Sequence, residues 1–304
     1  MQFRRIGQLV AVTTVSAVAL SGAQAVAQEN KTTISVTNIT DIHGHLEDKI
    51  GDPAKAGDEI GVARLQTLIK QVNEGQEFNL TSSGDNVGGS AFVSAISDDK
   101  YTLEALNKMG MKVSAVGNHE FDKGTEDLTE RIQPNSTYPI LGANVLKDGQ
   151  PLLKPSHVED VDGVKVGYVG TVTENTKYKV SAAKIPGVTF TDPVKATNEE
   201  ATRLKESGEA DVVVALFHED AQEYAEGFNK DVDVLFGGDT HQRTKGEIPR
   251  EGALPLQWAQ GHEYGKLLND VDITFDKSAN KVTDIQLSQY DATDAATVEP
   301  DAEI

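Results

Sequence analysis

Short apolar runs alternate with helix-forming segments along most of the chain. The apolar runs predict buried strands at 31–40, 78–82, 112–116, 140–144, 164–172, 211–217 and 232–236. Apolar spacing with capping and helix-breaking residues predicts helices at 62–72, 101–109, 125–133, 193–206 and 221–228. The helix at 125–133 is expected to end before Pro134. This alternation of strands and helices predicts an α/β fold.

The pattern changes in the last fifth of the chain. Three further strands are predicted at 254–260, 267–275 and 282–290, and we expect them to pair as antiparallel hairpins. The final segment, 291–304, has few apolar residues and is mostly small and acidic. Such a composition is typical of a linker, so we expect an acidic, linker-like tail there.

The N-terminus has the pattern of a signal peptide. Arg4 and Arg5 precede an apolar stretch at 6–20, and the small residues Ala25-Val26-Ala27 form a cleavage site, with 23–25 as an alternative. We therefore expect residues 1–27 to be removed and the protein to be secreted. The apolar stretch is too short for a membrane anchor. There is no cysteine, which excludes a disulfide framework.

The charge of the chain limits its partners. It carries 48 acidic against 28 basic residues, a formal net charge of −20. Such a surface repels nucleic acid polymers and anionic membranes, so neither is expected to bind. A small anionic substrate is still compatible with this charge, because bound divalent cations dominate the local field of a metal site.

Polar clusters follow several of the predicted strands at the points where they end. These clusters are Asp41 to His45, Gly84 to Asn86, Gly117 to Asp122, and Gly237 to His241, and His218 closes a further run. In α/β sheets, ligands bind beyond the carboxyl ends of the strands. Each cluster alone could be ordinary turn chemistry, and a lone histidine could be a buried structural residue. Together their imidazoles, carboxylates and one carboxamide predict a metal centre for Mn, Zn, Fe or Mg.

The order of these clusters resembles the calcineurin-like metallophosphoesterases. It is most similar to the secreted bacterial 5′-nucleotidases and UDP-sugar hydrolases, and the phrase from Gly117 to Asp122 is its most specific part. The resemblance runs from about residue 33 to 290. It implies a four-layer α/β/β/α sandwich with mixed sheets and a catalytic domain at 28–290. The second, nucleobase-binding domain of that family does not follow in this sequence, so weak nucleoside selectivity is expected.

The resemblance also implies a set of metal ligands. One divalent ion is expected to bind Asp41, His43, Asp85 and His241. The second ion is expected to share Asp85 and to bind Asn118, His218 and Asp239. The family usually has a histidine at the position of Asp239. A carboxylate there should favour Mn, Mg or Fe over Zn.

The catalytic roles are implied in the same way. His119 is expected to stabilise the transition state or protonate the leaving group, with Asp122 holding its ring, while His45 and Glu120 lie beside the site. We expect hydrolysis of nucleoside 5′-monophosphates or related esters by a hydroxide that bridges the two ions. A 2′,3′-cyclic-nucleotide phosphodiesterase or a UDP-sugar hydrolase on the same site is an alternative. A non-catalytic secreted binding protein with a decayed site is the alternative of another class.

Arg243 follows His241 closely and could contact a phosphate group. His157 and His262 are expected to be surface or packing residues. The sequence does not predict an oligomeric state.

Overall fold

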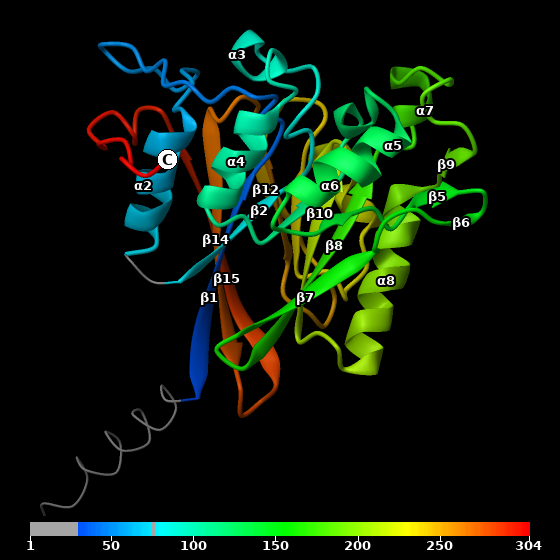
Figure 1. Cartoon of the computed structure of the whole chain (residues 1–304). Coiled ribbons are helices and arrows are strands. Elements are labelled where there is room, and N and C mark those ends of the chain that lie inside the picture. Colours follow the sequence, from blue (N-terminus) through cyan, green and yellow to red (C-terminus); the bar gives the residue numbers. More distant parts are fainter. Residues whose placement is uncertain (1–29, 75–76) are drawn as a thin grey trace, which may run out of the picture.

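Two six-stranded sheets form the centre of the molecule (Figure 1). The computed structural model describes residues 30–74 and 77–304, so the predicted signal peptide lies outside the described residues. The first sheet has the order β15-β14-β1-β2-β3-β4. Its strands are β1 (Lys31–Ile39), β2 (Phe78–Ser82), β3 (Val113–Ala115), β4 (Ile140–Leu141), β14 (Leu267–Asp276) and β15 (Lys281–Asp291).

The second sheet has the order β12-β13-β11-β10-β8-β7. Its strands are β7 (Ser156–Val161), β8 (Val164–Val172), β10 (Val212–His218), β11 (Val234–Gly237), β12 (Arg243–Ile248) and β13 (Leu256–Gly261). A small three-stranded sheet is added by β5 (Val145–Lys147), β6 (Gln150–Pro151) and β9 (Val188–Phe190). The two large sheets are mixed, because each joins four parallel strands to antiparallel strands at its edge.

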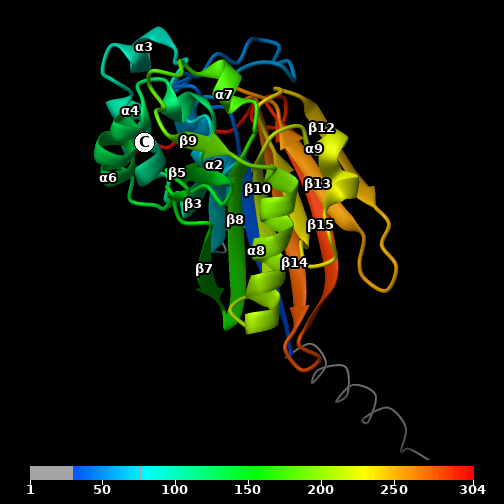
Figure 2. The ribbon, with the colours of Figure 1, turned by 90° about the vertical axis from the view of Figure 1, so that its right-hand side faces the viewer.

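Three layers of apolar side chains hold the sheets and helices together. Between the sheets, Val36 and Ile273 of the first meet Tyr168 and Phe236 of the second, all fully buried. Helices α2 (Val62–Val72) and α4 (Lys100–Lys108) cover the outer face of the first sheet. Helices α8 (Pro193–Ser207) and α9 (Ala221–Tyr224) cover the second (Figure 2). The predicted α/β/β/α sandwich is confirmed.

The carboxyl ends of the parallel strands meet at one edge of the sandwich. The loops beyond them carry the short helices α3 (Phe92–Ala95) and α7 (Thr176–Lys179), at the top of Figures 1 and 2, and the helical turn η1 (His119–Phe121). A further helical turn, η3 (Ala225–Gly227), directly follows α9. Within the described residues, no helix is long and apolar enough to cross a membrane.

Two expectations about the secondary structure were wrong. The segment at 125–133 forms three consecutive turns, α5 (Thr125–Asp127), the π-helical η2 (Leu128–Ile132) and α6 (Gln133–Asn135). Pro134 lies inside the last turn instead of ending the helix. A proline cannot donate an i→i−4 hydrogen bond, and the π-helical turn before it already interrupts that pattern.

Of the hairpins expected among the last three strands, the one between β14 and β15 is confirmed, because these strands pair antiparallel. The one between β13 and β14 is wrong: β13 joins the second sheet, parallel to β11 and antiparallel to β12, while β14 lies in the first sheet beside β1. Sequence proximity favoured the hairpin, but the alternation of apolar residues does not determine which strand becomes the neighbour.

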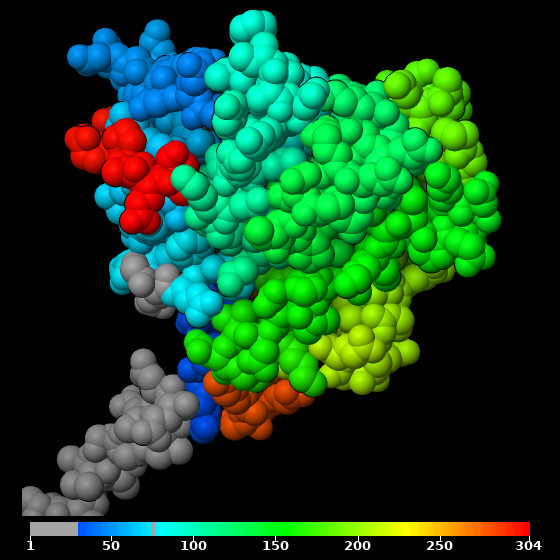
Figure 3. Space-filling view, in the orientation of Figure 1, coloured from blue at the N-terminus to red at the C-terminus, as the bar shows by residue number. Residues whose placement is uncertain are grey.

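In place of the expected linker, the segment after Asp291 packs on the molecule. Ala292, Ala295 and Val298 are buried in the core that includes α2. The guanidinium of Arg64 donates to the carbonyl of Val298, and Lys70 pairs with Asp301 at 2.6 Å. The segment, red in Figure 3, lies beside the blue surface of the N-terminal half. Ile304, at the end of the same segment, is partly buried against this core.

Candidate metal centre

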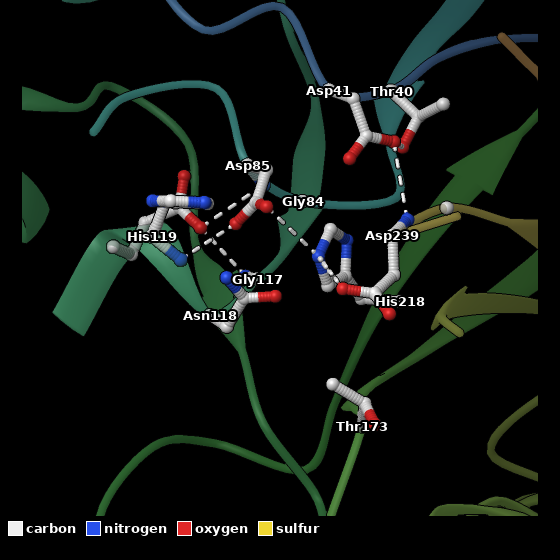
Figure 4. A network of polar contacts seen from close by, with 12 residues as sticks. Thr40, Asp41, Gly84, Asp85, Gly117, Asn118, His119, Thr173, His218 and Asp239 are labelled. Carbon is white, nitrogen blue, oxygen red and sulfur yellow. Dashed lines mark hydrogen bonds and ion pairs between the residues drawn. The ribbon is translucent and has the colours of Figure 1, made fainter. Parts of the chain in front are cut away.

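Four loops and the end of β10 bring all the candidate metal ligands to the same edge of the sandwich. Asp41 and His43 follow β1, Asp85 follows β2 and Asn118 follows β3. His218 is the last residue of β10, and Asp239 and His241 follow β11. Figure 4 shows Asp85 between His119 and His218. The clusters that the sequence places far apart therefore form one site.

The backbone of this site is unusual. The φ angles of Asp41, His43, Asp85, Asp239 and His241 are all positive, between 46° and 66°. Residues other than glycine rarely adopt this left-handed conformation, and each instance costs about 1–3 kcal/mol. Five such residues in one site indicate that the surrounding fold holds these side chains in place.

The first candidate ion site is formed by Asp41, His43 and His241. Their ligand atoms lie within 4.8 Å of one another. Nε2 of His241 is 3.4 Å and Nε2 of His43 is 3.9 Å from Oδ1 of Asp41. The other oxygen of Asp41 accepts a hydrogen bond from the Thr40 hydroxyl at 2.6 Å, which fixes the carboxylate.

Asp85 lies between the first site and the second. Its Oδ2 is 3.7 Å from Nε2 of His43 and 3.1 Å from Nε2 of His218. The group of Asp41, Asp85 and His218 again has ligand atoms within 4.8 Å. This position between two sets of nitrogen and oxygen donors is the geometry required of a bridging carboxylate.

The two buried histidines are oriented by backbone carbonyl groups. Nδ1 of His43 lies 2.7 Å from the carbonyl of Gly88, and Nδ1 of His218 lies 2.8 Å from that of Ser83. A ring nitrogen that donates to a carbonyl leaves the other nitrogen unprotonated and free to bind a metal ion. Nε2 of His218 is buried and makes no hydrogen bond of acceptable geometry. A divalent cation bound to this nitrogen would give it a partner.

The carboxylates and the histidines of the site shift one another's pKa values. Burial lowers the pKa of His218, but the nearby carboxylate of Asp85 raises it well above its ordinary value. Burial raises the pKa of Asp85, but His218 and His43 lower it far below its ordinary range. The cluster of carboxylates therefore needs positive charge, which divalent ions also supply.

Glu120 stabilises the loops from behind. Its carboxylate accepts hydrogen bonds from the backbone N–H groups of Asp85 at 3.0 Å, Asn86 at 2.8 Å and Gly117 at 2.6 Å. The loops after β2 and β3 approach each other closely at Gly117, where a Cβ would lie 2.2 Å from Oδ1 of Asp85. Glu120 thus ties the loop after β2 to the loop after β3.

His119 and Asp122 form a hydrogen-bonded pair at the mouth of the site. Nδ1 of His119 lies 2.8 Å from Oδ2 of Asp122. This hydrogen bond raises the pKa of His119 to about 9. A protonated imidazole at neutral pH can donate a proton from Nε2. His119 also has a ligand atom within 4.8 Å of those of His43 and Asp85, so metal ligation is a second possibility for this ring.

Most of the chain matches the model of a known family. Residues 34–243 match the family model described as calcineurin-like phosphoesterase. The chain belongs to the calcineurin-like phosphoesterase family. The enzymes of this family use divalent metal ions, in agreement with the donor set described above.

Several relatives of this phosphoesterase chain are named for nucleotide chemistry. The 5′-nucleotidase of Diplobatis ommata is 30% identical over 80% of the chain and 46% of its own length. Endonuclease YhcR of Bacillus subtilis is 28% identical over 88% of the chain and 24% of its own length. The structure of calcineurin-like phosphoesterase YfkN from Bacillus subtilis has a TM-score of 0.71 at 22% identity, covering 90% of this chain and 94% of that one. The phosphoesterase chain spans less than half the length of those two curated relatives.

Several residues of the phosphoesterase lie outside the centre. Arg243 forms an ion pair with Asp291 at 2.6 Å, and Asp291 is not one of the candidate metal ligands. His45 lies 2.9 Å from Glu59 and stacks on the ring of Tyr264. His157 pairs with Glu159, and His262 pairs with Glu263.

Lys179 is the residue of the phosphoesterase site that the sequence did not reveal. It lies at the end of α7, and its ammonium contacts Asp239 and lies 3.5 Å from Oδ1 of Asn118. No motif surrounds it, and it lies 60 positions from Asp239 and 61 positions from Asn118 along the chain. Only the folded connection between β8 and β9 brings it to the centre.

Proposed function

We propose that this protein is a secreted phosphoesterase that uses two divalent metal ions to hydrolyse nucleoside 5′-monophosphates or related small phosphate esters. The observation that supports this most is the position of Asp85, whose Oδ2 lies within 3.7 Å of Nε2 of His43 and 3.1 Å of Nε2 of His218. One carboxylate between two sets of donors is what a two-ion site requires.

The residues that would hold the ions follow from this geometry. Asp41, His43 and His241 would bind one ion together with Asp85. Asn118, His218 and Asp239 would bind the second, again with Asp85. Ions bound in such a pair lower the pKa of a water molecule and neutralise the charge on a phosphoryl group. The identity of the metal is left open among Mn, Zn, Fe and Mg, with the carboxylate of Asp239 favouring the harder ions.

The chain's own groups supply the proton chemistry. Nδ1 of His119 donates to Asp122, which leaves Nε2 to face the substrate. His119 with a raised pKa carries a proton there at neutral pH and can transfer it to the oxygen of the leaving group. Asp122 fixes the ring and stabilises its positive charge. This pair gives the site a use beyond binding, so we favour an enzyme over a binding protein with a decayed site.

The substrate proposal rests on charge and on relatives. The net charge of −20 opposes a polyanion, which must contact the surface far beyond the metal centre. A mononucleotide needs only the centre itself. The 5′-nucleotidase among the relatives is named for such a substrate, whereas the relative named endonuclease makes cleavage of nucleic acid the second candidate.

The test is phosphate ester hydrolysis by the protein stripped of metal and reloaded with Mn or Zn. AMP, 2′,3′-cyclic AMP, a UDP-sugar, bis(p-nitrophenyl) phosphate and single-stranded DNA form the panel. We expect metal-dependent release of phosphate from AMP at the highest rate. The Asp41→Ala variant, purified in the same way, is the control for contaminating phosphatases. Preference for DNA would replace the nucleotidase by a nuclease, and no turnover with any metal would favour the decayed site.

Secretion has a separate test. The predicted signal peptide should be cleaved after Ala27 or Ala25, so the protein recovered from outside the producing cell should begin at residue 28 or 26. N-terminal sequencing of that protein decides it, and an intact Met1 on the exported protein would contradict the proposal.

A further inference from the structure

Lys179 occupies the second ion site from the side of α7. Its ammonium contacts the carboxylate of Asp239 and lies 3.5 Å from Oδ1 of Asn118. Both are candidate ligands of the second ion. The Lys179 side chain is 37% exposed, whereas that of Asp239 is only 7% exposed. A cation on a flexible stem thus reaches in from the solvent to a nearly buried anion.

The two candidate sites differ in their assembly. The first has Asp41, His43 and His241 within mutual ligand distance. Asp239 belongs to none of the three such groups formed by the described residues. Its Oδ1 lies 3.6 Å from Nε2 of His218, but the same oxygen is held by Lys179. The first site is therefore ready for an ion, while the second is closed by an ion pair.

The amide of Asn118 lies beside the same carboxylate. With its nitrogen toward Asp239, the amide donates to Oδ1 of Asp239 at 2.7 Å and its oxygen accepts from the backbone N–H of His119 at 3.2 Å. A metal ligand must present the oxygen instead. The amide therefore also has to turn away from Asp239 before Asn118 can bind the second ion.

We propose that Lys179 competes with the second metal ion for Asp239 and Asn118, so that the two ions bind in sequence. This inference rests on the proposed two-ion function. The first ion binds Asp41, His43, Asp85 and His241 tightly. The second binds more weakly, because the ammonium must first leave Asp239. The occupancy of the second site then depends on the free metal concentration in the surroundings.

The carboxylate at position 239 is what makes this competition possible. A neutral imidazole, usual in the family at this place, does not attract an ammonium, whereas Asp239 does. The same negative charge that helps to bind a hard metal ion also binds Lys179 in its absence. Partly exposed ion pairs are weak, so the lysine should lower the affinity of the second site by about twofold to fivefold without abolishing it.

The experiment is a Mn²⁺ titration of the metal-stripped protein by calorimetry, with bound metal counted after equilibrium dialysis. We expect two classes of site in the wild type. In Lys179→Met the weaker class should tighten by about twofold to fivefold, and the tighter class should not change. Lys179→Arg keeps the positive charge and should retain the weak second site. Lys177→Met removes the same charge from the exposed face of α7 and serves as the matched control.

The outcomes separate this inference from the proposed function. Two sites of equal affinity in the wild type, or equal titrations of the wild type and Lys179→Met, would overturn the role of Lys179 and leave the two-ion centre intact. A tightening of the same size in Lys177→Met would reduce the effect to net charge and also overturn it. A wild type that binds no Mn²⁺ would refute the metal centre itself. Each result is read from metal binding and needs no active enzyme.

Discussion

At the scale of single residues, the surrounding fold holds the candidate ligands in backbone conformations that they rarely adopt by themselves. Nothing in their order predicted that Asp41, His43, Asp85, Asp239 and His241 all have positive φ. Such a conformation is imposed by the surrounding fold against the preference of the residue itself. Lys179 was missed for the same reason, since its role depends on a contact made only after folding.

His119 gives a prediction at this scale. Its Nδ1 is held by Asp122, and its backbone N–H donates to Oδ1 of Asp85 at 2.8 Å. His119→Ala keeps the backbone contact and removes only the ring. If the ring is a proton donor, kcat should fall by about 10²–10⁴-fold. The number of bound metal ions should be unchanged.

Steady-state kinetics and metal analysis of the same preparation check this prediction. Loss of one metal ion in His119→Ala would assign the ring as a ligand instead, which its proximity to His43 and Asp85 also allows. The fall in kcat should be larger for a substrate whose leaving group must be protonated. It should be smaller for a substrate that releases p-nitrophenolate, which needs no proton. A defect of equal size for both leaving groups would contradict proton donation.

At the scale of elements, long periodic segments were predictable and pairings were not. The spacing of Val62, Leu65 and Ile69 predicted α2 with the observed bounds, because three turns of buried residues leave little ambiguity. The hairpin expected between β13 and β14 does not form, because each strand has apolar residues that fit either sheet. Strand β7 was also not predicted, because His157, Glu159 and Asp160 leave too few apolar residues to give the alternating pattern of a strand.

Strand β14 carries a buried charge that makes the stability of the element depend on pH. Asp270 is 6% exposed, and among the described residues its carboxylate accepts a side-chain hydrogen bond from the Ser35 hydroxyl alone, at 3.4 Å. Burial, with a smaller contribution from Asp272, raises the pKa of Asp270 to about 6. The folded state then holds this proton more tightly than the unfolded chain, so stability falls as the pH rises from about 4 to about 6.

Replacing this carboxylate by an amide should remove that penalty. We expect Asp270→Asn to be more stable than the wild type at pH 8 by about 1–3 kcal/mol, with the difference disappearing below about pH 4. Urea unfolding at both pH values measures it. Asp284→Asn, on the exposed face of β15, removes the same charge and should change stability by less than about 0.5 kcal/mol. An equal gain at both pH values would show that the ionised carboxylate is not the cause.

At the scale of the whole molecule, the layers of the sandwich were predictable from the sequence, but the packing of residues 291–304 was not. Apolar strands flanked by amphipathic helices specify a sandwich with few alternatives. The composition of 291–304 predicted a linker, because most of its residues are small or acidic. Three apolar side chains are nevertheless buried, at positions 292, 295 and 298, spaced so that one side of the segment faces the core. Composition averages over both sides of a segment and so cannot detect this arrangement.

The packing of this segment has a measurable consequence for the stability of the domain. Val298 is 4% exposed, and its carbonyl accepts a hydrogen bond from Arg64 of α2. Val298→Ala keeps the carbonyl and removes two buried methyl groups, so we expect a loss of about 1–3 kcal/mol of stability. Thr297→Ala, at the exposed neighbouring position, should lie within about 0.5 kcal/mol of the wild type. Thermal unfolding of both variants compares a packed segment with a linker: a linker tolerates both changes equally, whereas a part of the core tolerates only the second.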